Sequence, residues 1–128
     1  MTTIHSYTGD QRIVDTMHKD LHRARAAALN MIPTSTGAAR TVGKVYEPVA
    51  GKLDGMAVRV PTPNVSMAIL NLNLEKATSR EEINEYLRQM AMHSDLQKQI
   101  DFVNSQEVVS TDFVGSRHAG VVDAEATI

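Results

Sequence analysis

The clearest alternation of hydrophobic and polar residues runs from Val65 to Glu75, where three leucines alternate with two asparagines. A period of two residues is typical of a strand with one buried face. Met67 and Ile69 fall on the asparagine side, so the predicted strand has apolar side chains on both faces. Either a second surface, such as another subunit, covers the far face, or a bulge shifts the alternation.

Four further segments have the composition of strands. Thr2 to Thr8 is rich in β-branched and aromatic residues, which favour extended backbone. Met56 to Val60 is predicted to form a strand with a charge, Arg59, near its end. Residues 108–114 and 119–124 are predicted to form two strands on either side of the turn Gly115-Ser116-Arg117.

Two segments are predicted to be helical. Ser79 and Glu82 form a capping-box pattern, which predicts a helix from about Arg80 to Met92. A second helix is expected from about Gly37 to Val45. The stretch from Gln11 to Asn30 has poor periodicity and predicts a long loop, which is unusual in a compact domain unless the loop is functional.

Size and charge exclude several classes of protein. The chain has 128 residues, enough for one domain or part of one. Its 13 basic and 15 acidic residues give a formal charge of −2, and no polybasic run is present, so neither nucleic acid nor a membrane surface is an expected partner. No apolar stretch approaches the roughly 20 residues of a membrane span, and no signal peptide is evident. A cytoplasmic protein fits this composition.

The chain has no cysteine. Within these residues, this excludes disulfides, thiolate metal sites and a cysteine nucleophile. His18 and His22 stand four apart, so a helix there would present them as a metal-binding pair, but no third ligand accompanies them and no metal site is expected.

The segment from Asp20 to Ala39 has the pattern of an anion-binding site. Arg23 and Arg25 precede Pro33-Thr34-Ser35-Thr36-Gly37, after which the predicted helix begins. A helix N-terminus presents unpaired N–H groups, and guanidinium groups match phosphate oxygens. The alternative, an ordinary threonine-capped helix behind two solvated arginines, remains open at this point.

Four stretches together resemble the catalytic domain of phosphorylating glyceraldehyde-3-phosphate dehydrogenases. They are TTIHSYTGDQ at 2–11, HKDLHRARAAALNMIPTSTGAA at 18–39, GKLDGMAVRVPTPNVS at 51–66 and EVVSTDF at 107–113. The resemblance implies an α+β domain, with a mostly antiparallel sheet and helices on one face. It also implies a homotetramer in the full-length enzyme, in which another subunit would cover the face with Met67 and Ile69.

The resemblance implies that residues 1–128 are a partial catalytic domain. The nucleotide-binding domain with its glycine-rich motif, the segment with the nucleophilic cysteine, and the final strand and helix of the family are absent from these residues. We therefore expect the 128-residue chain to be inactive by itself.

The resemblance also assigns roles to individual positions. His5 matches the histidine that activates the cysteine thiol of the family. The segment from Thr8 to about Leu29 matches a loop that lines the cofactor pocket. Thr16 and Met17 replace a Leu-Pro pair that is frequent in this loop, so the resemblance does not decide whether the cofactor is NAD or NADP.

Two phosphate sites are implied, one for the phosphate of the aldehyde substrate and one for the attacking inorganic phosphate. The matching positions are Thr8 and Arg59 with Asp10 beside them for the first site, Thr36 and Gly37 for the second, and Arg23 near both.

The leading hypothesis is therefore the catalytic domain of an NAD(P)-dependent phosphorylating aldehyde dehydrogenase. Such an enzyme converts glyceraldehyde 3-phosphate, NAD and inorganic phosphate into 1,3-bisphosphoglycerate in glycolysis or gluconeogenesis. One alternative is the catalytic domain of an erythrose-4-phosphate dehydrogenase, which shares the scaffold. A second alternative is a non-catalytic module that binds anions or assembles oligomers.

Overall fold

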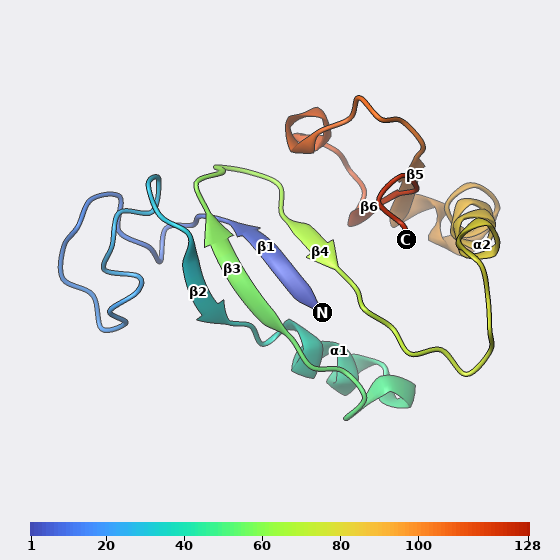
Figure 1. Cartoon of the computed structure of the whole chain (residues 1–128), viewed down its shortest axis with the longest axis horizontal. Coiled ribbons are helices and arrows are strands. Elements are labelled where there is room, and N and C mark those ends of the chain that lie inside the picture. The colour runs from blue at the N-terminus through green and yellow to red at the C-terminus, as the bar shows by residue number, and fades with distance from the viewer. The chain divides into compact units, whose positions relative to one another are not determined.

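The computed structural model describes residues 1–128 and divides into two units, Met1–Leu72 and Asn73–Ile128. A four-stranded sheet is the centre of the first unit. The strand order is β2-β3-β1-β4 (Figure 1). β1 pairs in parallel with β3, whereas β2 with β3 and β1 with β4 are antiparallel. The bounds are β1 Thr2–Ser6, β2 Ile32–Ser35, β3 Met56–Val60 and β4 Met67–Ile69.

The register of this sheet gathers several predicted site residues on one face. His5 in β1 lies opposite Arg59 in β3, and Arg59 lies opposite Ile32 in β2. Residues paired across neighbouring strands project to the same side of a sheet, and so do residues two apart in one strand. His5, Arg59 and Thr34 therefore share one face of the sheet.

The predicted loop from Gln11 to Asn30 has turns and bends but neither helix nor strand, as expected. It extends from one end of the sheet, in blue at the left of Figure 1. Backbone hydrogen bonds from Arg12 N to the Arg23 carbonyl (3.2 Å) and from Ala27 N to the Arg12 carbonyl (2.8 Å) fold the loop back on itself. Ala27 is buried within it.

The first unit also contains α1 (Ala38–Val45), within one residue of the predicted helix, and the short 3₁₀ helix η1 (Glu47–Val49). The strand β2, just before α1, was not predicted from the sequence. Pro33 argues against a central strand, but β2 lies at the edge of the sheet, where a missing N–H is tolerated.

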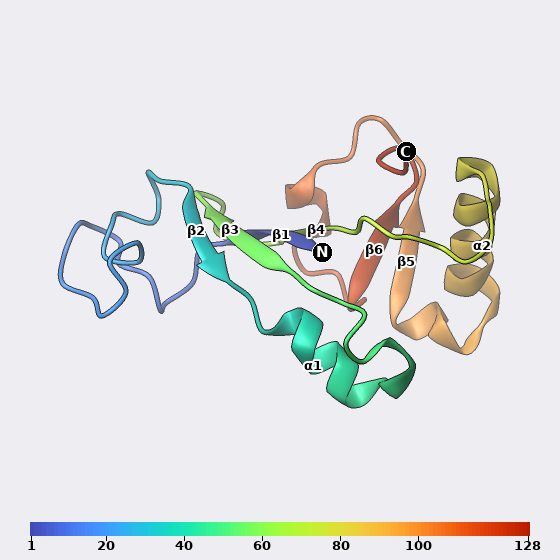
Figure 2. The same ribbon diagram turned by 60° about the horizontal axis from the view of Figure 1, so that its bottom comes forward.

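The second unit packs α2 (Arg80–His93) against β5 (Ile100–Val103), which pairs in parallel with β6 (Gly120–Asp123) (Figure 2). Two 3₁₀ helices, η2 (Asp95–Lys98) and η3 (Ser110–Phe113), complete it. The capping box is confirmed, because Glu82 N donates to Ser79 Oγ and Ser79 N donates to Glu82 Oε2, each at 3.2 Å. No helix of the chain has both the length and the apolar character that crossing a membrane requires.

The prediction of a strand at 108–114 is wrong. Its centre is the 3₁₀ helix η3, in which the Asp112 carboxylate accepts a hydrogen bond from Val109 N at 2.8 Å. Asp readily forms such local bonds, which favour turns over strand pairing. The predicted strand at 119–124 exists as β6, but its partner is β5 rather than the preceding segment.

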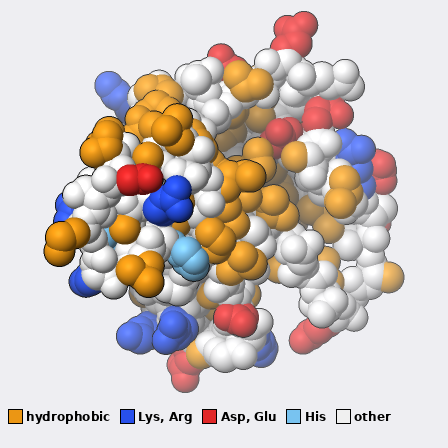
Figure 3. Space-filling view, turned by 60° about the vertical axis from the view of Figure 1, so that its left-hand side comes forward, with side chains coloured by type: hydrophobic (Ala, Val, Ile, Leu, Met, Phe, Trp, Pro, Cys, Tyr) orange, Lys and Arg blue, Asp and Glu red, His pale blue; other side chains and the backbone are white.

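The predicted strand from Val65 to Glu75 is much shorter, because β1 provides pairing partners only for Met67–Ile69. Leu70, Leu72 and Leu74 lie beyond the strand and are exposed, and many hydrophobic side chains are visible at the surface in Figure 3. The fold is α+β, but the expectation of a mostly antiparallel sheet is met only in part, since two of the four strand pairings are parallel.

Candidate anion-binding site

Arg59 is held by one end of its guanidinium group. Its Nη1 donates to Thr8 Oγ1 at 2.5 Å and to Gln11 Oε1 at 3.0 Å. Its Nε is buried without a partner. Its Nη2 makes no hydrogen bond within the chain, so one end of the guanidinium has donors left for an oxygen of a phosphate or carboxylate.

Arg23 connects the long loop to the sheet. It forms an ion pair with Asp10 through Nη1, and its Nη2 donates to Thr34 Oγ1 of β2 at 2.8 Å. Its Nε lies 3.6 Å from Asp20 Oδ2, too far for a hydrogen bond, and is buried without a partner. The loop therefore places a second guanidinium on the face of the sheet that carries Arg59.

The electrostatics of this network favour an added anion. Burial lowers the pKa of Arg59, the nearby positive charge of Arg23 lowers it further, and the Asp10 carboxylate partly offsets both effects. Two guanidinium groups that repel each other gain free energy when an oxyanion binds beside them.

Asp10 is the anionic partner within the network, and it should titrate at unusually low pH. The hydrogen bond from Arg23 lowers its pKa from the ordinary 3.8, more than partial desolvation raises it. Because the folded-state pKa lies below the unfolded one, the stabilisation by this pair is present above the unfolded pKa. It is lost as the pH falls through the folded pKa.

We expect ¹³C NMR of the carboxyl carbons to give a titration midpoint for Asp10 below 3.8, and Arg23→Gln to move that midpoint back up. Asp15 provides the internal control, because its pKa is lowered by a hydrogen bond from Ala26 N and by Arg25 rather than by Arg23. An Asp10 midpoint that does not respond to Arg23→Gln would show that another group holds the carboxylate.

His5 is oriented by its own strand. Its Nδ1 lies 2.5 Å from the Ser6 carbonyl oxygen. A carbonyl oxygen only accepts hydrogen bonds, so Nδ1 carries a hydrogen, and in the neutral ring Nε2 then has the free lone pair. The imidazole thus lies on the Arg59 face of the sheet in the tautomer that a proton acceptor needs.

Thr36 and Gly37 lie at the start of α1, in the same unit, but no hydrogen bond joins them to the arginine network. Thr36 Oγ1 accepts from Ala38 N at 3.2 Å, and Gly37 is an N-cap without a side-chain bond. A Cβ added to Gly37 would meet no atom within 4 Å, so its backbone is open to approach.

The remaining loop candidates lie outside the network. Thr16 and Met17 are exposed, and Arg25 pairs with Asp15 at 3.3 Å, so Arg25 does not share an anion site with Arg23. His18 Nε2 lies 3.8 Å from Asp10 Oδ1, and His22 is exposed. The structure forms no group of three potential metal ligands around them.

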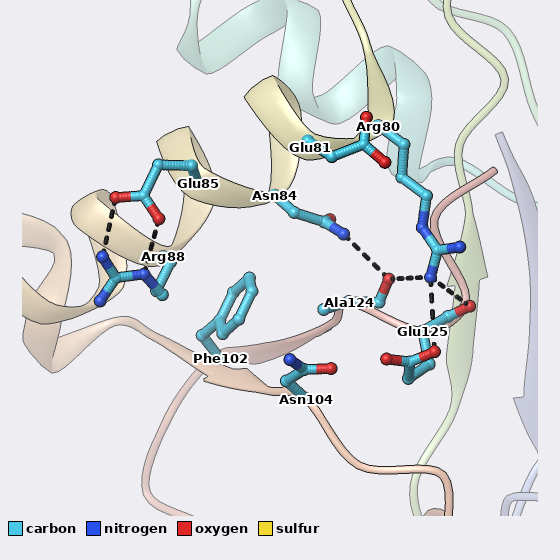
Figure 4. Close-up of a pocket in the computed structure, with 9 residues that line it drawn as sticks. All are labelled: Arg80, Glu81, Asn84, Glu85, Arg88, Phe102, Asn104, Ala124 and Glu125. Carbon is cyan, nitrogen blue, oxygen red and sulfur yellow. Dashed lines mark hydrogen bonds and ion pairs between the residues drawn. The ribbon is translucent and has the colours of Figure 1, made fainter.

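A separate cavity of about 420 Å³ lies in the second unit, between α2 and the ends of β5 and β6 (Figure 4). Its arginines are already paired with carboxylates. Arg88 lowers the pKa of Glu85 to about 2, and Arg80 lies 3.4 Å from Glu125 Oε2. In the first unit Arg23 is likewise paired with Asp10, whereas Arg59 hydrogen-bonds only to uncharged groups and keeps its charge unpaired.

Sequence reasoning assigned no role to Gln11 or Thr34, although both hold the arginines of this network. A threonine on an edge strand and a glutamine after a Gly-Asp turn carry no distinctive pattern. Their roles depend on contacts with residues far away in the chain.

Comparisons with known proteins match the whole chain, or nearly all of it, to glyceraldehyde-3-phosphate dehydrogenases. The family model for the glyceraldehyde 3-phosphate dehydrogenase C-terminal domain matches residues 1–128. A glyceraldehyde-3-phosphate dehydrogenase-like protein of Pseudomonas aeruginosa is 75% identical over 126 residues, 98% of this chain and 27% of that protein. The glyceraldehyde-3-phosphate dehydrogenase of Geobacillus stearothermophilus is 51% identical over 128 residues, 100% of this chain and 38% of that protein.

The chain thus spans between about a quarter and two-fifths of the length of these relatives. The same holds for a chloroplastic glyceraldehyde-3-phosphate dehydrogenase of Arabidopsis thaliana, which is 49% identical over the whole chain and of which the chain covers 32%. Because the family model covers every residue, the chain belongs to the family of the glyceraldehyde 3-phosphate dehydrogenase C-terminal domain.

Proposed function

We propose that this chain supplies the base and the phosphate-binding residues of an enzyme that oxidises and phosphorylates glyceraldehyde 3-phosphate to 1,3-bisphosphoglycerate, with NAD or NADP as oxidant. The observation that carries this proposal is the pair of guanidinium groups of Arg23 and Arg59, which lie on one face of the sheet and have Asp10 as their only hydrogen-bonded carboxylate. Such a pair is suited to a multiply charged oxyanion.

The phosphate of the aldehyde binds to Arg59 and Thr8 in this proposal. Arg59 offers its Nη2 group, and the Thr8 hydroxyl, which accepts from Arg59, still has its own hydrogen to donate. Arg23, held by Asp10 and Thr34, adds a second positive charge. The open backbone at Gly37 and the Thr36 hydroxyl form the proposed site for inorganic phosphate.

His5 acts as the base. With Nδ1–H fixed on the Ser6 carbonyl, Nε2 takes a proton from a cysteine thiol outside this chain and returns it to the aldehyde oxygen as the thiolate adds to the carbonyl carbon. It then takes the proton back from the hydroxyl of the resulting hemithioacetal as hydride leaves for the cofactor. A bound nicotinamide cofactor supplies the hydride acceptor. Thr16 and Met17 lie at the surface of the long loop, so they are accessible to a nucleotide held elsewhere in the enzyme.

Exposed apolar side chains support a proposed assembly into a homotetramer. Met67 and Ile69 of β4 are 59% and 43% exposed in the single chain. A second copy that packs on this strand would remove them from water, which is favourable in proportion to the apolar area buried.

The test uses a hybrid enzyme, in which this chain replaces the matching segment of the G. stearothermophilus relative. We expect the hybrid to reduce NAD or NADP in the presence of inorganic phosphate, with a higher kcat/KM for glyceraldehyde 3-phosphate than for erythrose 4-phosphate. The 128-residue chain alone, which has no cysteine, serves as the inactive control.

Two other outcomes would change the assignment. A higher kcat/KM for erythrose 4-phosphate would favour an erythrose-4-phosphate dehydrogenase. A folded, tetrameric hybrid that oxidises neither aldehyde would favour a non-catalytic module.

A further inference from the structure

We propose that Gln11 is a positioning residue, which holds the Arg59 guanidinium and the Thr8 turn in the arrangement that binds the substrate's phosphate. The inference rests on the proposed function above, because it concerns the same phosphate. It adds Gln11 to the site as a residue that affects binding indirectly, through Arg59 and Thr8.

Gln11 is the one polar side chain of the chain that is buried, with 4% of its surface exposed. Its Oε1 accepts hydrogen bonds from Arg59 Nη1 at 3.0 Å and from Thr8 N at 3.2 Å. Its own backbone N donates to the Thr8 carbonyl at 2.9 Å. A single carboxamide therefore fixes both groups that are proposed to contact the phosphate.

The orientation of this carboxamide is determined by its partners. Both contacts come from N–H groups, so the atom between them must be the oxygen, and Nε2 takes the other position. Nε2 is buried and has no acceptor in the chain. A buried donor without an acceptor is costly, so the two hydrogen bonds accepted by Oε1 have to offset this cost in holding the carboxamide here.

The uncharged nature of Gln11 matters as much as its position. A carboxylate at this place would form an ion pair with Arg59 and cancel much of the charge that attracts a phosphate. A carboxamide fixes the guanidinium and leaves its charge intact. Arg23 differs in this respect, because its holding partner is the Asp10 carboxylate.

The experiment compares two substrates in the hybrid enzyme, glyceraldehyde 3-phosphate and glyceraldehyde, which lacks the phosphate. Gln11→Met removes the acceptor at similar size and should raise KM for glyceraldehyde 3-phosphate roughly tenfold, with kcat changed by less than about twofold. The kcat/KM for glyceraldehyde should remain unchanged, whereas general damage to the fold would lower it.

A second variant, Gln11→Glu, keeps the acceptor oxygens and so preserves the hydrogen bonds that support the local fold. Its negative charge should still raise KM for glyceraldehyde 3-phosphate and leave glyceraldehyde unaffected. The matched control is Gln106→Met, at an exposed glutamine of the second unit, which should change neither substrate's kinetics.

The outcomes separate this inference from the proposed function. If the unaltered hybrid does not prefer glyceraldehyde 3-phosphate over glyceraldehyde, the phosphate site itself is wrong, and the inference falls with it. If the unaltered hybrid does prefer it, but the Gln11 variants change both substrates equally or neither, only the role of Gln11 is overturned.

Discussion

Replacement of His5 by asparagine in the hybrid enzyme is expected to lower kcat by about 10²- to 10⁴-fold, the usual contribution of a positioned acid–base group. The variant keeps the local structure, because the asparagine Nδ2 can donate to the Ser6 carbonyl in place of His5 Nδ1. It loses only the second ring nitrogen, which accepts the proton. KM for glyceraldehyde 3-phosphate should change little, since Arg59 and Thr8 remain.

Steady-state kinetics of NADH formation measure this effect, and His93→Asn is the matched control. His93 is the exposed last residue of α2 in the second unit and has no proposed role. A kcat reduced by less than tenfold in His5→Asn would remove His5 from the proton-transfer step. A similar loss in both variants would indicate general damage to the enzyme.

The elements that sequence predicted well are those whose signals are local. The capping box at Ser79 placed the start of α2 at Arg80, and the short apolar segment at 56–60 gave β3 its observed bounds. Both depend on neighbours within a few residues, so one sequence contains the required information.

The elements that sequence predicted poorly depend on distant partners. The alternating leucines after Ile69 continue the strand pattern, but no neighbouring strand pairs with them. Residues 108–114 have strand composition, and a single aspartate contact converts them into a turn. The parallel pairing of β5 with β6 is likewise a property of topology that periodicity does not encode.

The candidate site shows the same division. The resemblance pointed to Thr8, Asp10, Arg23 and Arg59, and the structure pairs Arg59 with Thr8 and Arg23 with Asp10. Gln11 also bonds to Arg59 and Thr34 to Arg23. The structure does not join them to Thr36 and Gly37.

Arg59→Ala is the substitution that should damage phosphate binding most. Loss of a charge-assisted contact costs about 1.5–3 kcal/mol, so kcat/KM for glyceraldehyde 3-phosphate in the hybrid should fall about 10- to 150-fold. The alanine also leaves Thr8 and Gln11 without the donor that holds them, which places the expected loss toward the upper end of this range.

Arg59→Lys distinguishes charge from shape. Lysine keeps the positive charge but cannot offer two parallel N–H groups, nor reach Thr8 and Gln11 with a planar fork. Its kcat/KM should lie between those of the unaltered hybrid and Arg59→Ala.

Arg117→Ala, at an exposed arginine of the second unit, should leave kcat/KM unchanged and control for the loss of one positive charge. Glyceraldehyde, without a phosphate, should be oxidised equally by all four enzymes. If Arg59→Ala leaves kcat/KM for glyceraldehyde 3-phosphate unchanged, the phosphate must bind elsewhere, and the unpartnered Nε of Arg59 would need another explanation.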